Sequence, residues 1–502
     1  MNTTLLILII FMVLNLGVGL YRPKEGIKKK SGGAQSALSD YYAANRSIQG
    51  WVVGVVVAAT MISGGSLIAT PGLIWSNGLC GAAWQQHGLW YGILGTAILG
   101  KRLSVLGTRV KANSIPHLLG IRFGEPTRLI TAALIVCILF ASTAMQYSAS
   151  ARVLQSASGL GYEVCVILIG VVMTLYLAFG GAKAQAWTNV IQAAFMTAGL
   201  FAIGIVAARQ FGVTNMIETM GKMDINLITL PGVNNYLTMG NYVSYSLILM
   251  ACIGISRPET NSRYLTMKKG SPYRLCLVLG SILVFLWYPC MYLAGMAAKV
   301  VLPNLPAADL ALPQITIELL PPILQGMTLA GILGATMSTA SALILTASAS
   351  ISNDFAYKWL EGRDEKSVKQ IVVAVTVIIS MGSVFISLNP PALLISMAAF
   401  ANGTMGVAFM PIMFGCLFFP GMTTLGALAG TLGGTVVTIL GYVTKNTYIW
   451  GFHCIGYGFF AGIALSILVS MITKHSSSEQ LDLFYTDGAI VKLDRRGAVM
   501  AD

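Results

Sequence analysis

Apolar runs of about 20 residues recur along almost the whole chain and alternate with short polar segments. Each run can cross a bilayer as a helix, because a helix rises about 1.5 Å per residue and the hydrocarbon core is roughly 30 Å thick. Helices are expected because lipid offers no partner to unpaired backbone groups, and the runs are too continuous for barrel strands. The pattern predicts an all-α protein with about 13 spans, placed at residues 3–20, 51–76, 80–100, 128–156, 163–179, 187–208, 240–256, 275–299, 323–350, 369–388, 392–418, 421–444 and 449–472.

Composition supports an integral membrane protein. Of 502 residues, 56% are hydrophobic and only 10% are charged, a balance that is rare in a soluble chain of this length. The first apolar run lacks a basic start and a small-residue cleavage site, so we expect it to remain as a span rather than to be removed. We therefore predict one transmembrane domain over residues 1–473 and a cytoplasmic tail over residues 474–502. That tail is too short for an enzyme domain.

The positive charge indicates an orientation. Most of the 31 lysine and arginine residues fall on alternate connecting segments, which places those segments in the cytoplasm, the amino terminus outside and the carboxyl terminus inside. The net charge of +13 is spread over these separate loops, so we do not expect a nucleic-acid partner. The 8 cysteines lie in or beside the apolar runs and are interpreted as small core residues.

Two spans are interrupted at comparable depth. Residues 63–66 (Ser-Gly-Gly-Ser) divide the second span, and Gly254 lies shortly before Pro258 in the seventh. These spans are five apart, so they cross the membrane in opposite directions. Paired breaks of this kind are typical of an inverted repeat with a binding site near the bilayer midplane, here spans 2–6 and 7–11. Helix packing through small residues remains the alternative for either break.

The ninth span carries hydroxyls and no charge. Ala335, Ser338 and Thr339 fall at i, i+3 and i+4, so they share one helical face. Such a face can hold a hard cation through neutral oxygens, together with carbonyls from an unwound helix. Hydrogen bonds from the two hydroxyls to the carbonyls of their own helix, at Gly334 and Ala335, are the alternative.

The acidic residues give a second clue about the ion. None of the 18 falls in the middle of an expected span, and His87 is the one clear titratable candidate there. A proton-driven carrier usually needs a titratable relay inside the membrane. Sodium, held by neutral oxygens, therefore fits this chain better than the proton.

Three segments resemble the corresponding regions of the sodium:solute symporter family: residues 39–72, 178–192 and 331–355. The resemblance implies a LeuT-like fold, in which the inverted five-helix repeat is joined by one amino-terminal and two carboxyl-terminal helices. It also implies a sodium ion between the second and ninth spans. The matching positions are Ala59, Ile62, Ala335, Ser338 and Thr339. Several members have an acidic residue where this chain has Met61, which argues against a second, carboxylate-assisted sodium site.

The resemblance also implies a solute pocket formed by several spans. Its polar candidates here are Ser63, Ser66, Gln85, Ser142, Gln146, Ser256 and Asn402. Gln85 matches a substrate-contacting glutamine of the sialic acid members. Proline-transporting members carry Trp and Tyr where this chain has Met250 and Gly254, which disfavours proline. Residues 144–181 are most similar to members that carry pantothenate, and the spans offer no buried arginine for its carboxylate, so helix amides or hydroxyls would have to bind that group.

These observations predict a transporter in the cell membrane. We expect sodium-coupled import of a small organic solute by alternating access, with a carboxylate-bearing nutrient such as pantothenate as the leading candidate. Another solute, such as an amino acid, betaine or organic acid, is the alternative, and a transporter-like membrane sensor is the rival from a different class. An enzyme is not expected, because the four histidines are scattered and lack ligand spacing.

Overall fold

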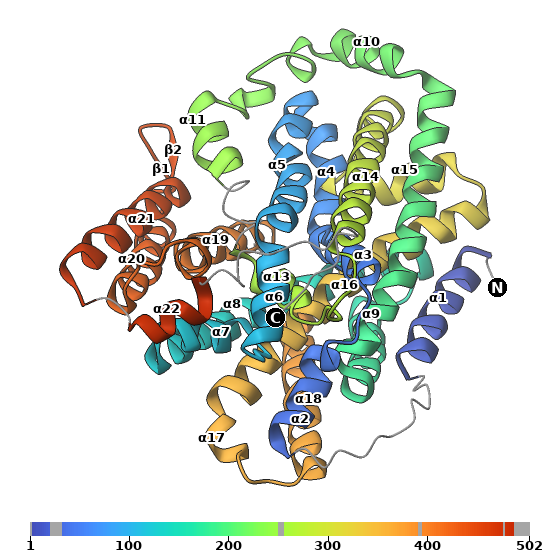
Figure 1. The fold of residues 1–502 in the computed structure, drawn as a ribbon. Coiled ribbons are helices and arrows are strands. Elements are labelled where there is room, and N and C mark those ends of the chain that lie inside the picture. The colour runs from blue at the N-terminus through green and yellow to red at the C-terminus, as the bar shows by residue number, and fades with distance from the viewer. Residues whose placement is uncertain (1–2, 21–32, 249–255, 390–393, 475–476, 486–502) are drawn as a thin grey trace.

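The computed structural model describes residues 3–20, 33–248, 256–389, 394–474 and 477–485. Most of these residues are helical (Figure 1). Up to residue 241 the helices are α1 (Thr3–Leu20), α2 (Ala34–Ala43), α3 (Gly50–Met61), α4 (Gly64–Asn77), α5 (Leu79–Gly95), α6 (Lys101–Arg109), α7 (Ile115–Phe123), α8 (Glu125–Ser158), α9 (Tyr162–Phe211), α10 (Val213–Met223) and α11 (Met239–Asn241). From residue 258 they are α13 (Pro258–Tyr264), α14 (Tyr273–Val301), α15 (Ala311–Leu319), α16 (Pro322–Ala349), α17 (Tyr357–Leu360), α18 (Glu365–Leu388), α19 (Leu394–Phe418), α20 (Thr424–Val443), α21 (Cys454–Ile472) and α22 (Ser478–Tyr485).

Short irregular elements connect or extend these helices. Three π-helical segments, Thr96–Gly100, Tyr242–Leu247 and Ser350–Phe355, follow α5, α11 and α16. The expectation of a purely helical chain is corrected by one small antiparallel hairpin, in which β1 (Tyr448–Ile449) pairs with β2 (Phe452–His453). The last expected span began at residue 449, whereas α21 begins at Cys454, because the hairpin uses the residues before it.

Eight helices of the described residues are long and apolar enough to span a membrane, or nine if the bent pair α3 and α4 is one span. The expected number of about 13 is not confirmed by this criterion. One reason is that the expected spans 163–179 and 187–208 run together in α9, where Gly181 joins two helices with a φ of 55°. The predicted break at Gly254 lies outside the described residues.

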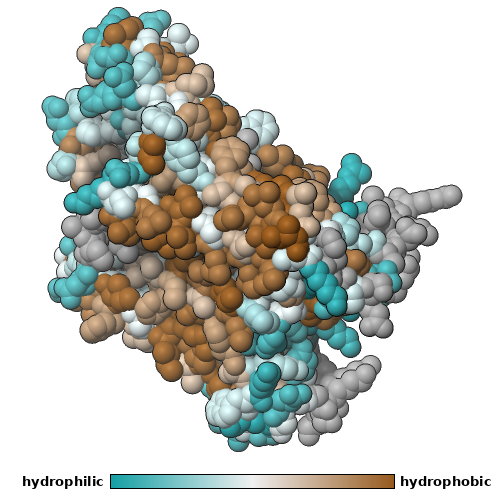
Figure 2. Space-filling model, turned by 90° about the vertical axis from the view of Figure 1, so that its left-hand side faces the viewer, coloured by the Kyte–Doolittle hydropathy of each residue, from teal (hydrophilic) through white to brown (hydrophobic). Residues whose placement is uncertain are grey.

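The surface fits a membrane environment. Figure 2 shows a broad hydrophobic band between hydrophilic regions at opposite ends of the molecule. Large apolar side chains are exposed on several of the long helices, among them Val13, Ile378, Phe385 and Ile467. Such exposure would be costly in water, whereas in a bilayer these side chains contact lipid.

The helix α16 lies at the centre of the bundle. Its most apolar 18-residue stretch is completely buried, unlike that of any other candidate span among the described residues. It packs against α9, α8 and α1. A helix buried on all sides can carry polar side chains only if they bond to protein, which directs attention to its hydroxyls.

We call the end of the molecule near α10 the α10 end and the opposite end, near α2 and α17, the α2 end (Figure 1). Several segments that carry the basic residues meet at the α2 end. Arg46 donates to the carbonyls of Gly107 and Ala112, and Ile48 forms a parallel bridge with Met267. The shared location of these segments is consistent with their lying on one side of the membrane.

Candidate functional site

The expected break in the second span lies between α3 and α4. These two helices meet at an angle of 51°, with Ile62 and Ser63 outside helical geometry. The Ser63 hydroxyl accepts a hydrogen bond from the Ser66 amide and so caps the start of α4. The Ser63 amide donates to the Met61 carbonyl, so the Ala59 carbonyl loses the partner that a continuous helix would supply.

The hydroxyls of α16 meet these freed carbonyls. Ser338 Oγ donates to the Ala59 carbonyl at 2.7 Å and to the Ala335 carbonyl at 3.0 Å. Thr339 Oγ1 donates to the Thr60 carbonyl at 3.0 Å. The cross-helix bonds are therefore present, and for Ser338 the bond to its own helix is present as well. The alternative of bonds within the helix thus holds for Ser338 and Ala335, whereas the hydroxyl of Thr339 reaches α3 instead.

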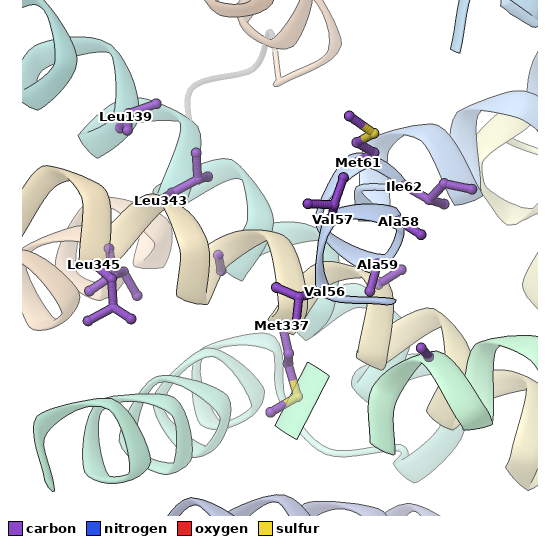
Figure 3. Packing of buried hydrophobic residues seen from close by; sticks show 14 of the residues in the cluster. Val56, Val57, Ala58, Ala59, Met61, Ile62, Leu139, Met337, Leu343 and Leu345 are labelled. Atoms are coloured by element: carbon purple, nitrogen blue, oxygen red, sulfur yellow. The ribbon is translucent and has the colours of Figure 1, made fainter. Parts of the chain in front are cut away.

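Four of the five predicted sodium positions come together in this way. Ala59, Ala335, Ser338 and Thr339 are all fully buried. Ile62 is also buried and lies at the break itself, although no hydrogen bond joins its carbonyl to α16 among the described residues. Figure 3 shows the end of α3, where Met61 and Ala59 project to different sides of the helix.

The donor set suits a small hard cation. It combines backbone carbonyls of α3 and α16 with two side-chain hydroxyls, all of them neutral oxygens. A cation placed among them would let the hydroxyls rotate and present lone pairs instead of hydrogens. His and Cys are not part of the set, and groups of His, Cys, Asp or Glu that could hold a transition metal are absent from the described residues.

Three of the predicted solute residues surround the same break. Gln146 on α8 is 7% exposed, and its Oε1 has no hydrogen-bond partner. A Cβ atom added at Gly64 would lie 3.3 Å from this oxygen and 1.9 Å from Thr336 Cγ2. Ser63 and Ser66, which flank the glycines in sequence, complete this group.

The other predicted solute residues are placed differently. Ser142 donates to the Ile138 carbonyl of its own helix. Gln85 is buried on α5, and Ser256, just before α13, is buried with an unpartnered hydroxyl. Asn402 lies on α19, but its side chain is outside the described part of the chain, as is that of His87.

Sequence reasoning missed three residues at the break. Thr60 supplies a carbonyl to Thr339, and Thr336 packs against Gly64. Asn189 on α9 donates to Thr60 Oγ1 at 3.5 Å, while its Oδ1 is buried without a partner. A signal was available, since both Asn189 and Thr336 fall in the segments that carry the family resemblance.

A broken helix whose freed carbonyls meet a hydroxyl-bearing helix inside an apolar bundle is the arrangement of secondary active transporters. The particular family follows from the sequence. The profile described as the sodium:solute symporter family matches residues 41–434, so the chain belongs to that family. It is a multi-pass plasma membrane protein and a transporter rather than an enzyme, and sodium is its coupling ion.

Individual relatives extend over nearly the whole chain. The sodium/pantothenate symporter of Escherichia coli is 28% identical over 496 residues, which cover 96% of this chain and 98% of that protein. The osmoregulated proline transporter OpuE of Bacillus subtilis is 25% identical and covers 91% of this chain and 94% of its own length. Both matches extend over most of the two chains compared, although the names of the two relatives give different solutes.

Solved structures give the fold. An outward-open, substrate-bound Na⁺-coupled sialic acid symporter matches with a TM-score of 0.77 at 18% identity, over 95% of this chain and 99% of that one. MhsT in complex with L-phenylalanine matches with a TM-score of 0.51 at 14% identity, over 84% and 97% of the two chains. The fold is therefore LeuT-like.

Proposed function

We propose that this chain imports a small carboxylate-bearing solute, with pantothenate as the best candidate, together with one sodium ion by alternating access. The observation that carries the proposal is the oxygen set in which Ser338 and Thr339 meet the carbonyls of Ala59 and Thr60. The proposed ion site comprises Ala59, Ile62, Ala335, Ser338 and Thr339. Its position at a helix break allows ion binding to fix the angle between α3 and α4, and so to favour one conformation.

We infer the number of sodium ions from the charges at the break. The oxygen set is neutral, and Met61 occupies the position where other members carry an acid. A second sodium ion close to the first would be repelled by it, and no negatively charged side chain at the break would offset that repulsion. We therefore assign one ion to the site.

The solute part of the proposal rests on chemistry and similarity together. The unpartnered Gln146 Oε1 beside Gly64 can accept a hydrogen bond from a hydroxyl or amide of the solute. The first turn of α4 points backbone amides at the break, where a carboxylate is stabilised by the helix dipole. Pantothenate carries hydroxyls, an amide and a carboxylate, and two sodium/pantothenate symporters are similar to this chain over most of its length.

Orientation is part of the proposal. The basic segments that meet at the α2 end are those expected in the cytoplasm under the positive-inside rule. We infer that the solute enters from the α10 end and leaves at the α2 end, with the amino terminus outside and the carboxyl terminus inside.

Uptake into proteoliposomes tests the function. We expect an inward sodium gradient to drive accumulation of labelled pantothenate, and unlabelled pantothenate inside to drive counterflow, which a channel cannot support. A potassium gradient is the matched control. If L-proline competed strongly and pantothenate did not, the proposed solute would be wrong, whereas the proposed coupling to sodium would stand. Equal uptake in a proton gradient without sodium would contradict the coupling.

A further inference from the structure

The helix α13 carries a guanidinium that the sequence did not reveal as buried. Arg263 is 3% exposed. Its nitrogens donate to neutral oxygens only: the Gln185 side chain, the hydroxyls of Ser262 and Thr346, and the Glu259 carbonyl. Arg263 lies between two expected spans, and it is buried because α13 packs against α3 and α16 rather than lying in a solvated loop.

Arg263 forms no ion pair among the described residues, although the nearby Glu259 carboxylate interacts with it electrostatically. The buried ion pairs of the described residues include Arg257 with Glu259 and Arg128 with Asp354, and Arg263 is in neither of them. Removing a cation from water without a counter-ion is costly, and hydrogen bonds to neutral groups recover only part of that cost. Because Glu259 is shared with Arg257, these three side chains together keep one net positive charge, which favours the binding of an anion.

A second donor lies beside it. Gln185 on α9 is completely buried, and its Oε1 accepts from Arg263. Its Nε2 has no hydrogen-bond partner. Both side chains line one cavity of about 10 Å³ between α3, α9 and α13, which has room for about one water molecule, so a carboxylate can enter only when these helices move apart. The other walls of the cavity are Ile48, Val53, Val56, Ala182, Ala186 and Thr266.

The cavity lies between the break and the α2 end. Val53 and Val56 belong to α3, and Val53 precedes Ile62 by about 13 Å along a helix axis, at about 1.5 Å per residue. A solute that leaves the break towards the α2 end would meet this cavity once α3 and α13 separate.

We propose that Arg263 and Gln185 form an anion-binding site that takes the carboxylate of the solute during release at the α2 end. The guanidinium and the free amide hydrogens bind the two carboxylate oxygens, while the apolar walls from α3 and α9 accept the adjoining carbons. The identity of the anion as a solute carboxylate rests on the proposed function. The existence of the site rests on Arg263, Gln185 and the cavity alone.

The first test uses acetate as a probe and needs no transport. The apparent melting temperature of the purified protein is measured in sodium-free detergent solution as potassium acetate replaces potassium chloride. We expect acetate to stabilise the wild type. The variant Gln185→Glu places a carboxylate beside Arg263, so we expect a higher melting temperature without acetate and no further gain with it.

Two arginine variants complete this test. In Arg263→Gln the response to acetate should be lost, and in Arg263→Lys, which keeps the charge, it should be partly retained. If acetate shifts all four proteins equally, or shifts none of them, the site does not exist. Because pantothenate is absent, neither result depends on the identity of the transported solute.

The second test locates the site on the release path. Counterflow in proteoliposomes of known orientation gives the half-saturating pantothenate concentration separately at each end. We expect Arg263→Gln and Gln185→Glu to raise it tenfold or more at the α2 end and less than twofold at the α10 end. Equal changes at both ends would overturn the release role, and absence of sodium-driven uptake in the wild type would count against the proposed function instead.

Discussion

Ser338 Oγ lies 2.7 Å from the carbonyl oxygen of Ala59, which ties the centre of α16 to the last turn of α3. The two residues are 279 positions apart in sequence. Their contact is possible because the break after Met61 frees carbonyls that a continuous helix would use. This hydrogen bond therefore depends on the break, and an ion inserted here would connect α3 to α16.

Gly64 leaves no room for a side chain at the helix break. A Cβ atom would lie 1.9 Å from Thr336 Cγ2, so we expect Gly64→Ala to lower the uptake rate at least about tenfold, since the clash must be relieved by moving α4 away from α16. The double variant Gly64→Ala with Thr336→Ser removes the clashing methyl and should recover most of the rate. Initial uptake rates at matched expression check this. No recovery in the double variant would mean that the glycine is needed for backbone reasons instead.

Gln146 is expected to contact the solute. Its Oε1 is buried without a partner and can accept a hydrogen bond from the solute. In Gln146→Leu the donor group of the solute would lose this acceptor. We expect the KM for the solute to rise about tenfold, corresponding to roughly 1–2 kcal/mol, with the half-saturating sodium concentration unchanged. Ser142→Ala is the control on the same helix, because that hydroxyl is bonded to its own backbone. A rise confined to the sodium constant would assign Gln146 to the ion instead.

One sodium and one monoanion carry no net charge together. We therefore expect accumulation of pantothenate to follow the sodium gradient, at about tenfold for a tenfold gradient, and to ignore the membrane potential. For a neutral solute, the sodium ion would carry one net charge inward, and a membrane potential of 100 mV would add about 2.3 kcal/mol to the driving force for uptake. Potassium diffusion potentials of either sign, set with valinomycin, distinguish these cases. Inward current at saturating substrate would require a second cation.

The environment of His453 leads us to expect that the stability of the folded protein depends on pH. Burial lowers the pKa of His453 to about 4, and its Nδ1 accepts from the Ile455 amide at the start of α21. Tyr245, Tyr442 and Tyr448 surround the ring, and all of them are neutral in this pH range. The pKa of a histidine in the unfolded chain is near 6.5. The stabilisation of the folded protein by neutral His453 is therefore complete above pH 6.5 and is lost as the pH falls towards 4.

The matched variant is His453→Asn, which keeps a capping acceptor that does not titrate. Between pH 7 and pH 5 we expect the apparent melting temperature of the wild type to fall more than that of the variant. Parallel curves for the two proteins would show that His453 does not control acid stability.

The features that the sequence predicted are local patterns. The spacing of Ala335, Ser338 and Thr339 places them on one helical face in any α-helix, and the serines and glycines after Ile62 weaken a helix wherever it lies. Family resemblance then paired these two features. No local pattern could show that Thr60 rather than Ile62 accepts from Thr339, because that depends on the rotation of α3 against α16.

Other features depend on packing between distant segments. Asp354 was expected in a loop, yet it is buried at the end of α16 and paired with Arg128 on α8. Tyr485 in the expected tail donates to the Gly415 and Cys416 carbonyls, so part of the tail docks on the end of α19. Arg263 is a third residue that the sequence places between spans and that packing buries. Polar residues near span ends are therefore the hardest to place from sequence, since the same composition suits a solvated loop and a buried network.

The most direct test of the central claim is sodium binding by the purified protein when the two hydroxyls of α16 are removed. Thermal stabilisation is measured against sodium concentration for wild type, Ser338→Ala, Thr339→Ala and the control Thr328→Ala. Thr328 lies nearer the start of α16, where its hydroxyl bonds to the Leu324 carbonyl of the same helix and to the Gly199 carbonyl of α9. We expect the half-saturating sodium concentration to rise at least about tenfold in the first two variants, for the loss of one buried oxygen ligand, and to stay within twofold in the control. Unchanged sodium dependence in both Ser338→Ala and Thr339→Ala would contradict the site.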